Sequence, residues 1–552
     1  MCESNQKRCA IIGAGVSGLP SARWAKEYGY EPVIFEVRDN VGGLWYYQDK
    51  ETEFSCVMKK TIMNTSKEMS AFSDFPPPAD TPWFMTNRRM HSYLTSYAEH
   101  HNLLDYCRFK HKVTKVERTS DYANSGEWNV EYIDGNDNAN METFQAVLIC
   151  TGRQSIPYMP KQYPGQNEFE GTIIHSKNFK EVSKFANKNV LIVGLGNSGT
   201  DAASEISQVA KKCYLSTRRG AWILHRTING QPNDFYSNRR IMGYVKKVLG
   251  EKFHSWMMEK VFTRCFDHTV FGLKPQHRAC NQNPILICDE LQLRLAAGQV
   301  VLKPAISSFT KTSVNFQDGS TALIDDVVFC TGFSYSFEYL EDGKLIPTDE
   351  GELRLWKNMF PLSLLETNKQ SLAVIGMLQL SGAIMCAMEM QARVFFEMNA
   401  GNIKLPPIIS MTQQVDQEVE KRKAQYLHAR ASCTKVSYID YMRDLANLIG
   451  CYANPMKMVL KDPYLAYRLV FHPDLPYSYR LVGPHKWRKA RETICTVDQR
   501  MKQGLQNGMG QSVKNEGLFC KKQYSFSYII SLTISSTLLF VLFKTWISYL
   551  VV

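Results

Sequence analysis

The chain has 552 residues, of which 44% are hydrophobic, and this suits two or three domains with large buried cores. Its net charge of +12 would suit a nucleic-acid partner, but no nucleic-acid-binding motif appears, so we expect none. The 15 cysteines are scattered without CxxC pairs or zinc-like spacing, which indicates reduced thiols in a cytosol-facing protein and no metal site.

A glycine-rich turn stands near the N-terminus, after the apolar run 9–12 and before a helix-like stretch. Strand, tight turn and helix in this order place a dinucleotide pyrophosphate at the helix N-terminus. Segment 31–36 is predicted to be a buried strand ending on Glu36, where a carboxylate meets an unphosphorylated ribose hydroxyl. FAD and NAD both offer that hydroxyl. The predicted contacts of the turn are Gly13, Ala14, Gly15, Val16, Ser17 and Gly18.

Paired glycines at 42–43 follow Glu36 closely and favour a flavin in this half of the chain. Because glycine has no Cβ atom, the backbone there can approach a ligand. We therefore assign FAD to the first unit and add Gly43, Leu44 and Trp45 to its predicted contacts.

A second strand–turn–helix unit begins at the apolar run 189–193. The strand predicted at 212–216 ends without an acid and is followed by Arg218 and Arg219. A guanidinium binds a 2′-phosphate in bidentate fashion, so we assign NADPH to this unit. A solvated turn carrying the two arginines is the alternative. The predicted contacts are Gly194, Gly196, Asn197, Ser198, Gly199, Thr200, Asp201 and Arg218.

Two apolar segments that end in Cys-Thr-Gly, 147–152 and 327–332, bracket the second unit. This echo predicts an α/β protein with two Rossmann-like domains, the NADPH domain being inserted into the FAD domain. We place the FAD-binding domain at 1–155 and 331–445, and the NADPH-binding domain at 156–330 with a basic helical insertion at 229–285. A C-terminal region and linker would then occupy 446–522.

The stretch 237–264 carries seven Lys and Arg against two acids, interleaved with apolar residues near helical spacing. It suits an amphipathic element that rests on anionic lipid. The alternative is a helix packed on its own domain or on a second subunit, and the latter case would make the protein a homo-oligomer. Farther on, residues 526–543 carry no charge, close to the minimum length of a membrane span. We predict a membrane helix at 523–552; a buried terminal helix is the alternative.

Between the two units, Phe169, Gly171, His175 and Phe179 match the spacing FxGxxxHxxxF. With the flanking glycine turns, this resembles the signature of the class B flavoprotein monooxygenases. Segments 64–69, 216–222 and 271–275 and the apolar C-terminus narrow the resemblance to the animal flavin-containing monooxygenases, over nearly the whole chain. The resemblance implies a microsomal enzyme of the endoplasmic reticulum membrane with its catalytic body in the cytosol.

The resemblance also implies the chemistry. NADPH would reduce FAD, and a C4a-hydroperoxyflavin would then oxygenate the nitrogen or sulfur of a small amine or sulfide, with O₂ as co-substrate. Baeyer–Villiger oxygenation of ketones with the same cofactors, or an uncoupled NADPH oxidase, are the alternatives. No residue pattern decides between nitrogen or sulfur and ketone oxygenation.

Asn64 is the expected key side chain, because an amide donates and accepts hydrogen bonds without titrating. By resemblance it lies beside the flavin and NADP⁺ with Met63 and Thr65. The alternative is that 65–68 is a capping box that starts a helix, with Asn64 a mere neighbour. Asn197 is the second catalytic candidate, and otherwise a turn residue. We expect His175 to fix the interdomain linker, and Gln379 to close over the flavin.

Overall fold

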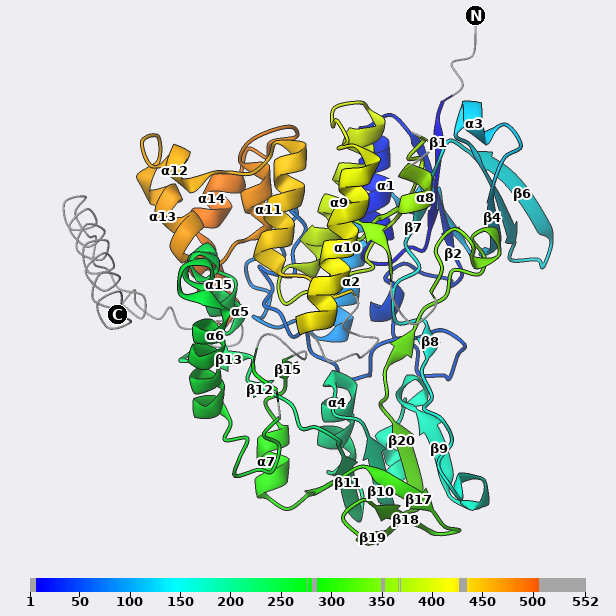
Figure 1. Cartoon of the computed structure of the whole chain (residues 1–552), viewed down its shortest axis with the longest axis vertical. Helices are drawn as coiled ribbons and strands as arrows, with labels where there is room; N and C mark the ends of the chain where they lie inside the picture. Colours follow the sequence, from blue (N-terminus) through cyan, green and yellow to red (C-terminus); the bar gives the residue numbers. More distant parts are fainter. Residues whose placement is uncertain are drawn as a thin grey trace, which may run out of the picture.

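A computed structural model of the chain describes residues 6–275, 277–279, 285–348, 353–365, 367, 369–425 and 434–505. Two five-stranded parallel sheets form the centres of an upper and a lower half of the molecule (Figure 1). In both sheets the strand that leads into a glycine turn lies at the centre, between the next strand of its unit and a strand from later in the chain. The predicted pair of parallel α/β units is therefore confirmed.

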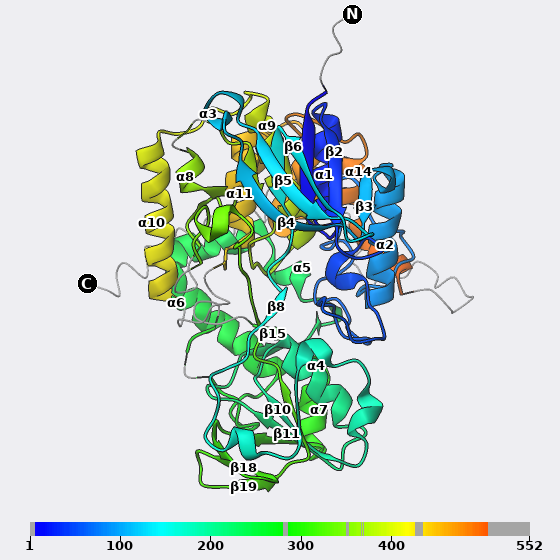
Figure 2. The same cartoon turned by 90° about the vertical axis from the view of Figure 1, so that its right-hand side faces the viewer.

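The upper sheet has its two faces covered by different elements. Successive residues of a strand point to opposite faces, so Cys9 and Ile11 pack beneath helices α1 and α9. Ala10 and Ile12 instead pack against a three-stranded antiparallel sheet, visible at the front of the upper half in Figure 2. The upper sheet runs in the order β24 (Leu372–Val374), β7 (Ala146–Ile149), β1 (Arg8–Ile12), β2 (Glu31–Glu36) and β3 (Cys107–Phe109). Its covering elements are α1 (Gly18–Glu27), α9 (Ile384–Asn399), β4 (Lys112–Arg118), β5 (Trp128–Ile133) and β6 (Ala139–Phe144).

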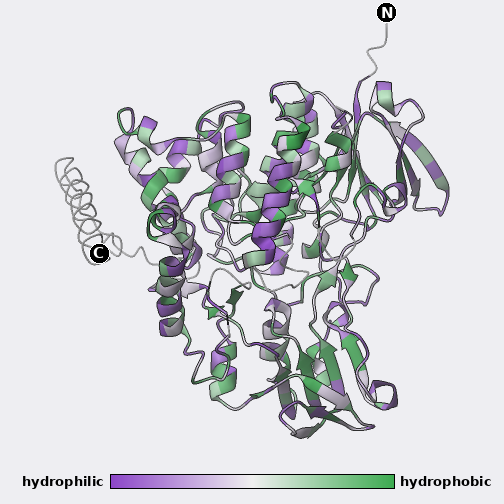
Figure 3. Ribbon diagram, in the orientation of Figure 1, coloured by the Kyte–Doolittle hydropathy of each residue, from purple (hydrophilic) through white to green (hydrophobic). Residues whose placement is uncertain are grey.

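The lower sheet repeats this two-sided arrangement. Val190 and Ile192 face α4, whereas Leu191 and Val193 face a second antiparallel sheet. Figure 3 shows the lower strands mainly in the green of hydrophobic residues, as expected where both faces are buried. The order is β16 (Val300–Lys303), β11 (Lys212–Ser216), β10 (Asn189–Val193), β20 (Asp326–Phe329) and β9 (Thr172–His175). Its flanking elements are α4 (Asn197–Ile206), α7 (Leu291–Ala296), β17 (Ile306–Phe309), β18 (Ser313–Phe316) and β19 (Thr321–Leu323).

The two halves are joined by two chain segments that pair with each other. Strand β8 (Ile156–Pro157) leads down and β21 (Phe333–Ser334) leads back, and the two are antiparallel. After the return, β24 adds to the upper sheet beside β7. The upper sheet thus contains strands from both before and after the lower one.

The basic stretch forms a helix with a break. Helix α6 (Arg240–Cys265) is interrupted at Gly250, whose φ of 81° is not helical. Arg240 at its start forms a buried ion pair with Asp474, and Phe262 near its end is fully buried. Short elements lie close by: β12 (Ile223–Leu224), β13 (Thr227–Ile228), β14 (Gln231–Pro232), α5 (Asp234–Ser237) and β15 (Leu286–Ile287).

Helices from the C-terminal part lie beside the upper sheet in Figure 1. They are α10 (Ile408–Gln425), α11 (Tyr438–Ile449), α12 (Pro455–Met458), α13 (Pro463–Phe471), α14 (Ala490–Cys495) and α15 (Val497–Gln503), with the 3₁₀ turn η9 (Pro476–Arg480). Further elements are α2 (Asn87–His100), α3 (Tyr122–Ser125), β22 (Leu355–Trp356), β23 (Phe360–Pro361) and α8 (Leu362–Leu365).

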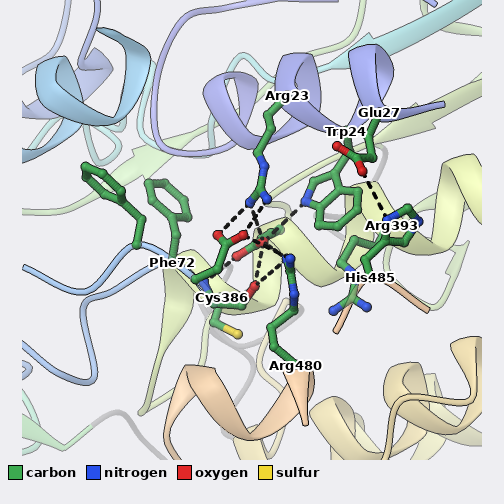
Figure 4. A network of polar contacts seen from close by, with 12 residues as sticks. Arg23, Trp24, Glu27, Phe72, Cys386, Arg393, Arg480 and His485 are labelled. Atoms are coloured by element: carbon green, nitrogen blue, oxygen red, sulfur yellow. Dashed lines mark hydrogen bonds and ion pairs between the residues drawn. The ribbon is translucent and has the colours of Figure 1, made fainter. Parts of the chain in front are cut away.

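A buried polar network fastens η9 to α1 and α9 (Figure 4). Glu389 of α9 has no exposed surface and accepts hydrogen bonds from the backbone N–H and hydroxyl of Ser73, each at 2.7 Å. Arg23 and Arg480 both pair with Asp74 and with Glu389. Two cations thus face two carboxylates, and loss of one partner would leave a buried charge uncompensated, at a cost of about 3–5 kcal/mol.

The predicted membrane helix at 523–552 lies outside the described residues. Within the described ranges, no helix combines the length and the apolar character needed to cross a bilayer.

Candidate functional site

The first glycine turn has a backbone that other residues would not adopt. Gly13 has a φ of +109°, and a Cβ atom on it would lie 2.7 Å from the carbonyl oxygen of Cys150. A Cβ on Gly18 would lie 1.8 Å from the Gly13 carbonyl oxygen. These two glycines therefore let the turn close tightly between β1 and α1, with the helix N-terminus facing the turn.

Glu36 lies at the end of β2 beside this turn. In the parallel register Ile12 pairs with Phe35, so the turn and Glu36 leave the sheet at the same edge. The carboxylate accepts the N–H of Ala14 at 2.8 Å and that of Arg38 at 2.9 Å. Burial raises the pKa of Glu36, and these backbone donors oppose the rise. Glu36 thus also fixes the shape of the turn.

The second predicted glycine pair completes a cradle above the first turn. A Cβ on Gly43 would lie 3.0 Å from the Cα of Gly15, and the Gly42 N–H donates to the Ala14 carbonyl at 2.9 Å. The two backbones therefore face each other with no side chain between them. Val16, Leu44 and Trp45 are half-buried around this cradle, and Ser17 is buried.

The turn of the lower half repeats the geometry of the first. Gly194 has a φ of +112°, and its Cβ would lie 2.6 Å from the Cys330 carbonyl oxygen. A Cβ on Gly199 would lie 2.0 Å from the Gly194 carbonyl oxygen, whereas one on Gly196 would meet no atom within 4 Å. Gly196 therefore faces open space, where a ligand can approach the backbone.

Helix α4 begins at Asn197, directly after Gly196. Asn197 is exposed, and its Oδ1 accepts the N–H of Ile287 at 3.4 Å. Ser198 is half-buried, and the buried Thr200 bonds to the Asn197 carbonyl at 2.9 Å. Asp201 lies one turn into the helix, and burial raises its pKa to about 6.

Arg218 lies at the same edge of the lower sheet as this turn. Val193 pairs in register with Ser216, so the chain leaves β11 beside the glycines and reaches Arg218 two residues later. Its side chain is exposed. Within the described ranges, no hydrogen bond or ion pair engages its guanidinium. An anion at this edge would therefore find an uncommitted cation.

Asn64 lies in a segment without regular structure, between Met63, which is buried, and the half-buried Thr65. Its Oδ1 accepts a hydrogen bond from Nη2 of Arg226 at 2.9 Å. The alternative of a helix starting at Thr65 is wrong, because residues 67–70 form only a turn. The Glu68 side chain does not cap a helix and instead accepts hydrogen bonds from Tyr477 and Arg500.

Three residues near Asn64 were not expected from the sequence. Arg226 bonds to the Asn64 segment, Asp289 pairs with Arg226, and Asp234 accepts the N–H of Ser66 at 2.6 Å. All three come from the lower half or its insertion, 160 or more residues away along the chain. No local motif marks them, so no signal in a single sequence could have found them.

Gln379 follows β24, and three residues before it a Cβ on Gly376 would lie 3.4 Å from the Cβ of Ser17 in the first turn. Its backbone pairs with Thr434 and Val436, and its Oε1 is buried without a hydrogen-bond partner among the described residues. An orphaned buried oxygen is uncommon in native proteins and points to a missing donor. With the cradle of Gly15 and Gly43, it fits a bound group that carries N–H or O–H donors, such as a flavin nucleotide.

His175 ends β9 and holds the two connecting segments together. Its Nδ1 accepts the N–H of Lys177 at 3.1 Å, so Nε2 carries the proton donated to the Gly332 carbonyl at 3.0 Å. Burial lowers the pKa of His175, so the ring is neutral at pH 7. Both ring nitrogens are engaged in the linker, as the sequence predicted for this residue.

Comparison with known proteins shows the family to which the chain belongs. The sequence profile of the flavin-binding monooxygenase-like family matches residues 6–542. The chain belongs to this family. Flavin-containing monooxygenase 5 of Rattus norvegicus is 40% identical over 504 residues, covering 91% of this chain and 93% of the relative. Dimethylaniline monooxygenase (N-oxide-forming) 2 of the same species is 38% identical over 499 residues, covering 90% and 92%. The resemblance inferred from the motifs is confirmed.

Solved structures agree on the fold. S-allyl-L-cysteine S-oxygenase from Allium sativum superposes with a TM-score of 0.62 at 20% identity, covering 91% of this chain and 99% of that one. Cyclohexanone monooxygenase from Rhodococcus sp. Phi1, bound to NADP⁺, gives 0.57 at 16% identity, covering 83% and 98%. At these identities the likeness concerns the fold alone.

Proposed function

We propose that the chain is an NADPH- and FAD-dependent monooxygenase that transfers one oxygen atom of O₂ to soft nucleophilic nitrogen or sulfur atoms of small molecules. The observation that carries this proposal is the pair of glycine turns with matching geometry. One is closed by the carboxylate of Glu36 and the other has the free guanidinium of Arg218 at its edge. This difference suits FAD in the upper half and NADPH in the lower half.

Bound FAD, reduced by NADPH, supplies the redox chemistry and activates O₂. The protein's part is to bind, orient and keep water out. The cradle of Gly15 and Gly43 would admit the FAD pyrophosphate, and the Oε1 of Gln379 would accept from the flavin. Gly196 would admit the NADPH pyrophosphate, and Arg218 would bind the 2′-phosphate.

Asn64 is proposed as the amide beside the reacting oxygen, with Met63 and Thr65, and Asn197 as a second amide at the nicotinamide side. An amide holds an oxygen atom by hydrogen bonds without titrating near neutral pH. The half-buried place of Asn64 at the junction of the two halves supports this role. We further propose the division into an FAD domain (1–155 and 331–445), an NADPH domain (156–330) and a C-terminal region (446–522).

The test is oxygen consumption by purified enzyme with a tertiary amine, a thioether and a ketone, with products and H₂O₂ quantified. With the amine and the thioether, we expect the amount of N-oxide or sulfoxide formed to nearly equal the amount of NADPH consumed. Ester or lactone as the main product would favour ketone oxygenation. H₂O₂ as the main product with all three substrates would show an NADPH oxidase and overturn the proposal.

We also propose that the enzyme sits on the endoplasmic reticulum membrane with its body in the cytosol. The uncharged run 526–543 and the likeness to animal relatives support this. A further support is a set of seven large side chains on α6 and α13 that are 41–52% exposed and that we call the α6–α13 surface: Tyr244, Val248, Phe253, Trp256, Tyr464, Tyr467 and Phe471. Lys246, Lys247 and Lys252 lie among those of α6, which suits anionic lipid.

A further inference from the structure

Arg226 reaches from the lower half of the molecule into the segment that carries Asn64. Its Nε donates to the Met63 carbonyl and its Nη2 to the Ile62 carbonyl, each at 3.2 Å. The same Nη2 donates to Oδ1 of Asn64 at 2.9 Å. The other side of the guanidinium pairs with Asp289, with 2.6 Å between Nη1 and Oδ2. One planar group thus holds three consecutive residues of the upper half.

Arg226 also connects the two catalytic candidates. Asp289 anchors Arg226 twice, because its Oδ1 accepts the Arg226 backbone N–H at 2.8 Å. Two residues before Asp289, the N–H of Ile287 donates to Oδ1 of Asn197. The chain of contacts therefore runs from Asn197 through segment 287–289 to Arg226 and then to Asn64. The segment around Asn64 has no helix or strand of its own. Its backbone is held by the isolated bridge of Ile62 with Thr86, and the Asn64 side chain is held by Arg226.

The chemistry of the contact decides which end of the Asn64 amide is free. A guanidinium only donates, so the amide atom facing Arg226 must be the oxygen. The Nδ2 group then has no acceptor among the described residues and can donate to a ligand. A cationic donor on the amide oxygen also polarises the amide and strengthens its N–H groups as donors. Lysine could not reproduce this arrangement, because it lacks the planar fork that reaches several acceptors at once.

We infer that Arg226 is a positioning residue for the oxygen-transfer step. When the two halves are placed as in this structure, Arg226 holds the Asn64 amide so that the amide nitrogen faces the reacting oxygen. The inference rests on the proposed function. Asn64 would touch the reacting group, and Arg226 would act only through Asn64.

The test compares Arg226→Gln, Arg226→Lys and Asp289→Asn in the FAD-bound enzyme. For Arg226→Gln we expect anaerobic reduction of the flavin by NADPH to stay within about twofold of wild type, since hydride transfer does not use Asn64. The ratio of sulfoxide to H₂O₂ should fall by roughly ten- to a hundredfold, the range for the loss of charge-assisted bonds. Arg226→Lys should behave similarly, and Asp289→Asn should change the ratio in the same direction by less.

A second readout does not depend on activity. Hydrogen exchange of the amides in 61–66 should be faster in Arg226→Gln than in wild type, because Arg226 fastens this segment. Arg294→Gln is the matched control: Arg294 also lies in the lower half, is similarly shielded, and bonds to Glu290 and Gln299 rather than to the Asn64 segment. It should change neither the product ratio nor the exchange of 61–66.

The outcomes separate the two proposals. An Arg226→Gln enzyme as well coupled as wild type, even with faster exchange, would show a purely structural contact and overturn the positioning role. Recovery of full coupling by lysine would overturn the argument from the guanidinium fork. A wild-type enzyme that consumed NADPH without oxygenating any substrate would overturn the proposed function, and the positioning role with it.

Discussion

Arg500 donates from its Nε to Oε1 of Glu68 over 3.0 Å, although 432 residues separate the two in the chain. Glu68 has no exposed surface, and its other oxygen accepts the hydroxyl of Tyr477 at 2.6 Å. Lys67 completes the contact by donating to the Arg500 carbonyl at 3.0 Å. Helix α15, the last described helix, is therefore fastened directly to the turn that follows Asn64.

Arg500→Gln should lower the free energy of unfolding by about 3 kcal/mol, because Glu68 would be left as a buried carboxylate without its cation. Chemical denaturation of the FAD-bound enzyme measures this. The double variant with Glu68→Gln should lose clearly less than the sum of the two single changes. Additive losses would show that the pair contributes no coupling.

Asn64→Ala should retain FAD and accept hydride from NADPH, yet fail to deliver oxygen to substrate. The loss of one neutral hydrogen-bonding partner costs about 1–3 kcal/mol, which favours H₂O₂ release by roughly ten- to a hundredfold. The measurement is the yield of sulfoxide and of H₂O₂ per NADPH consumed, with Asn124→Ala on the surface as control. Coupling equal to wild type would remove Asn64 from the catalytic site.

Arg218→Ala should raise the KM for NADPH far more than the KM for NADH. The side chain is exposed and would contact only the 2′-phosphate, which NADH lacks. A lost charge-assisted bond costs on the order of 1.5–3 kcal/mol, or about ten- to a hundredfold in binding. The check is steady-state kinetics with both cofactors, and an unchanged preference would contradict the assignment of the lower site.

Asp234→Asn should remove a pH dependence from stability. Burial raises the pKa of Asp234 from 3.8 to about 6, and its Oδ1 has no partner among the described residues. A raised carboxyl pKa means that the stabilisation is complete below pH 3.8 and is lost as the pH rises through 6. The asparagine variant keeps an oxygen for the Ser66 N–H without this loss. From pH 4 to pH 7, the free energy of unfolding of the variant should rise relative to that of wild type by on the order of 3 kcal/mol, measured by denaturation. A difference independent of pH would contradict the protonated carboxyl.

Deletion of residues 523–552 should release the protein from membranes in part or completely, and FAD should stay bound, because every predicted FAD contact precedes the deletion. Flotation with microsomal vesicles and the flavin absorbance of the soluble fraction measure both. Residual binding should then disappear on Trp256→Glu, which places a charge on the α6–α13 surface. Loss of FAD on deletion would show instead that the tail is part of the folded body.

The local patterns of the sequence determined the two glycine turns and the strands around them. Gly18 and Gly199 are required by the carbonyl oxygens of Gly13 and Gly194, five residues earlier, and Gly13 and Gly194 by their own positive φ, so the spacing alone predicts the turn. The same holds for Glu36, which lies at a fixed distance along one strand–turn–helix–strand unit. Such features depend on short-range sterics and on the register of neighbouring strands, and both are visible in a single sequence.

Only the tertiary structure decided how Asn64 is held. The sequence allowed a capping box at 65–68, but Glu68 is bound by Tyr477 and Arg500 instead, and no helix forms there. In the same way, Arg226 donates a hydrogen bond to Asn64 although 162 residues separate them in the chain. Contacts between segments so far apart leave no periodicity or motif in one chain, because they depend on where the whole backbone brings side chains together. The sequence therefore predicted where the cofactors bind, and the packing of distant segments decided how Asn64 is held.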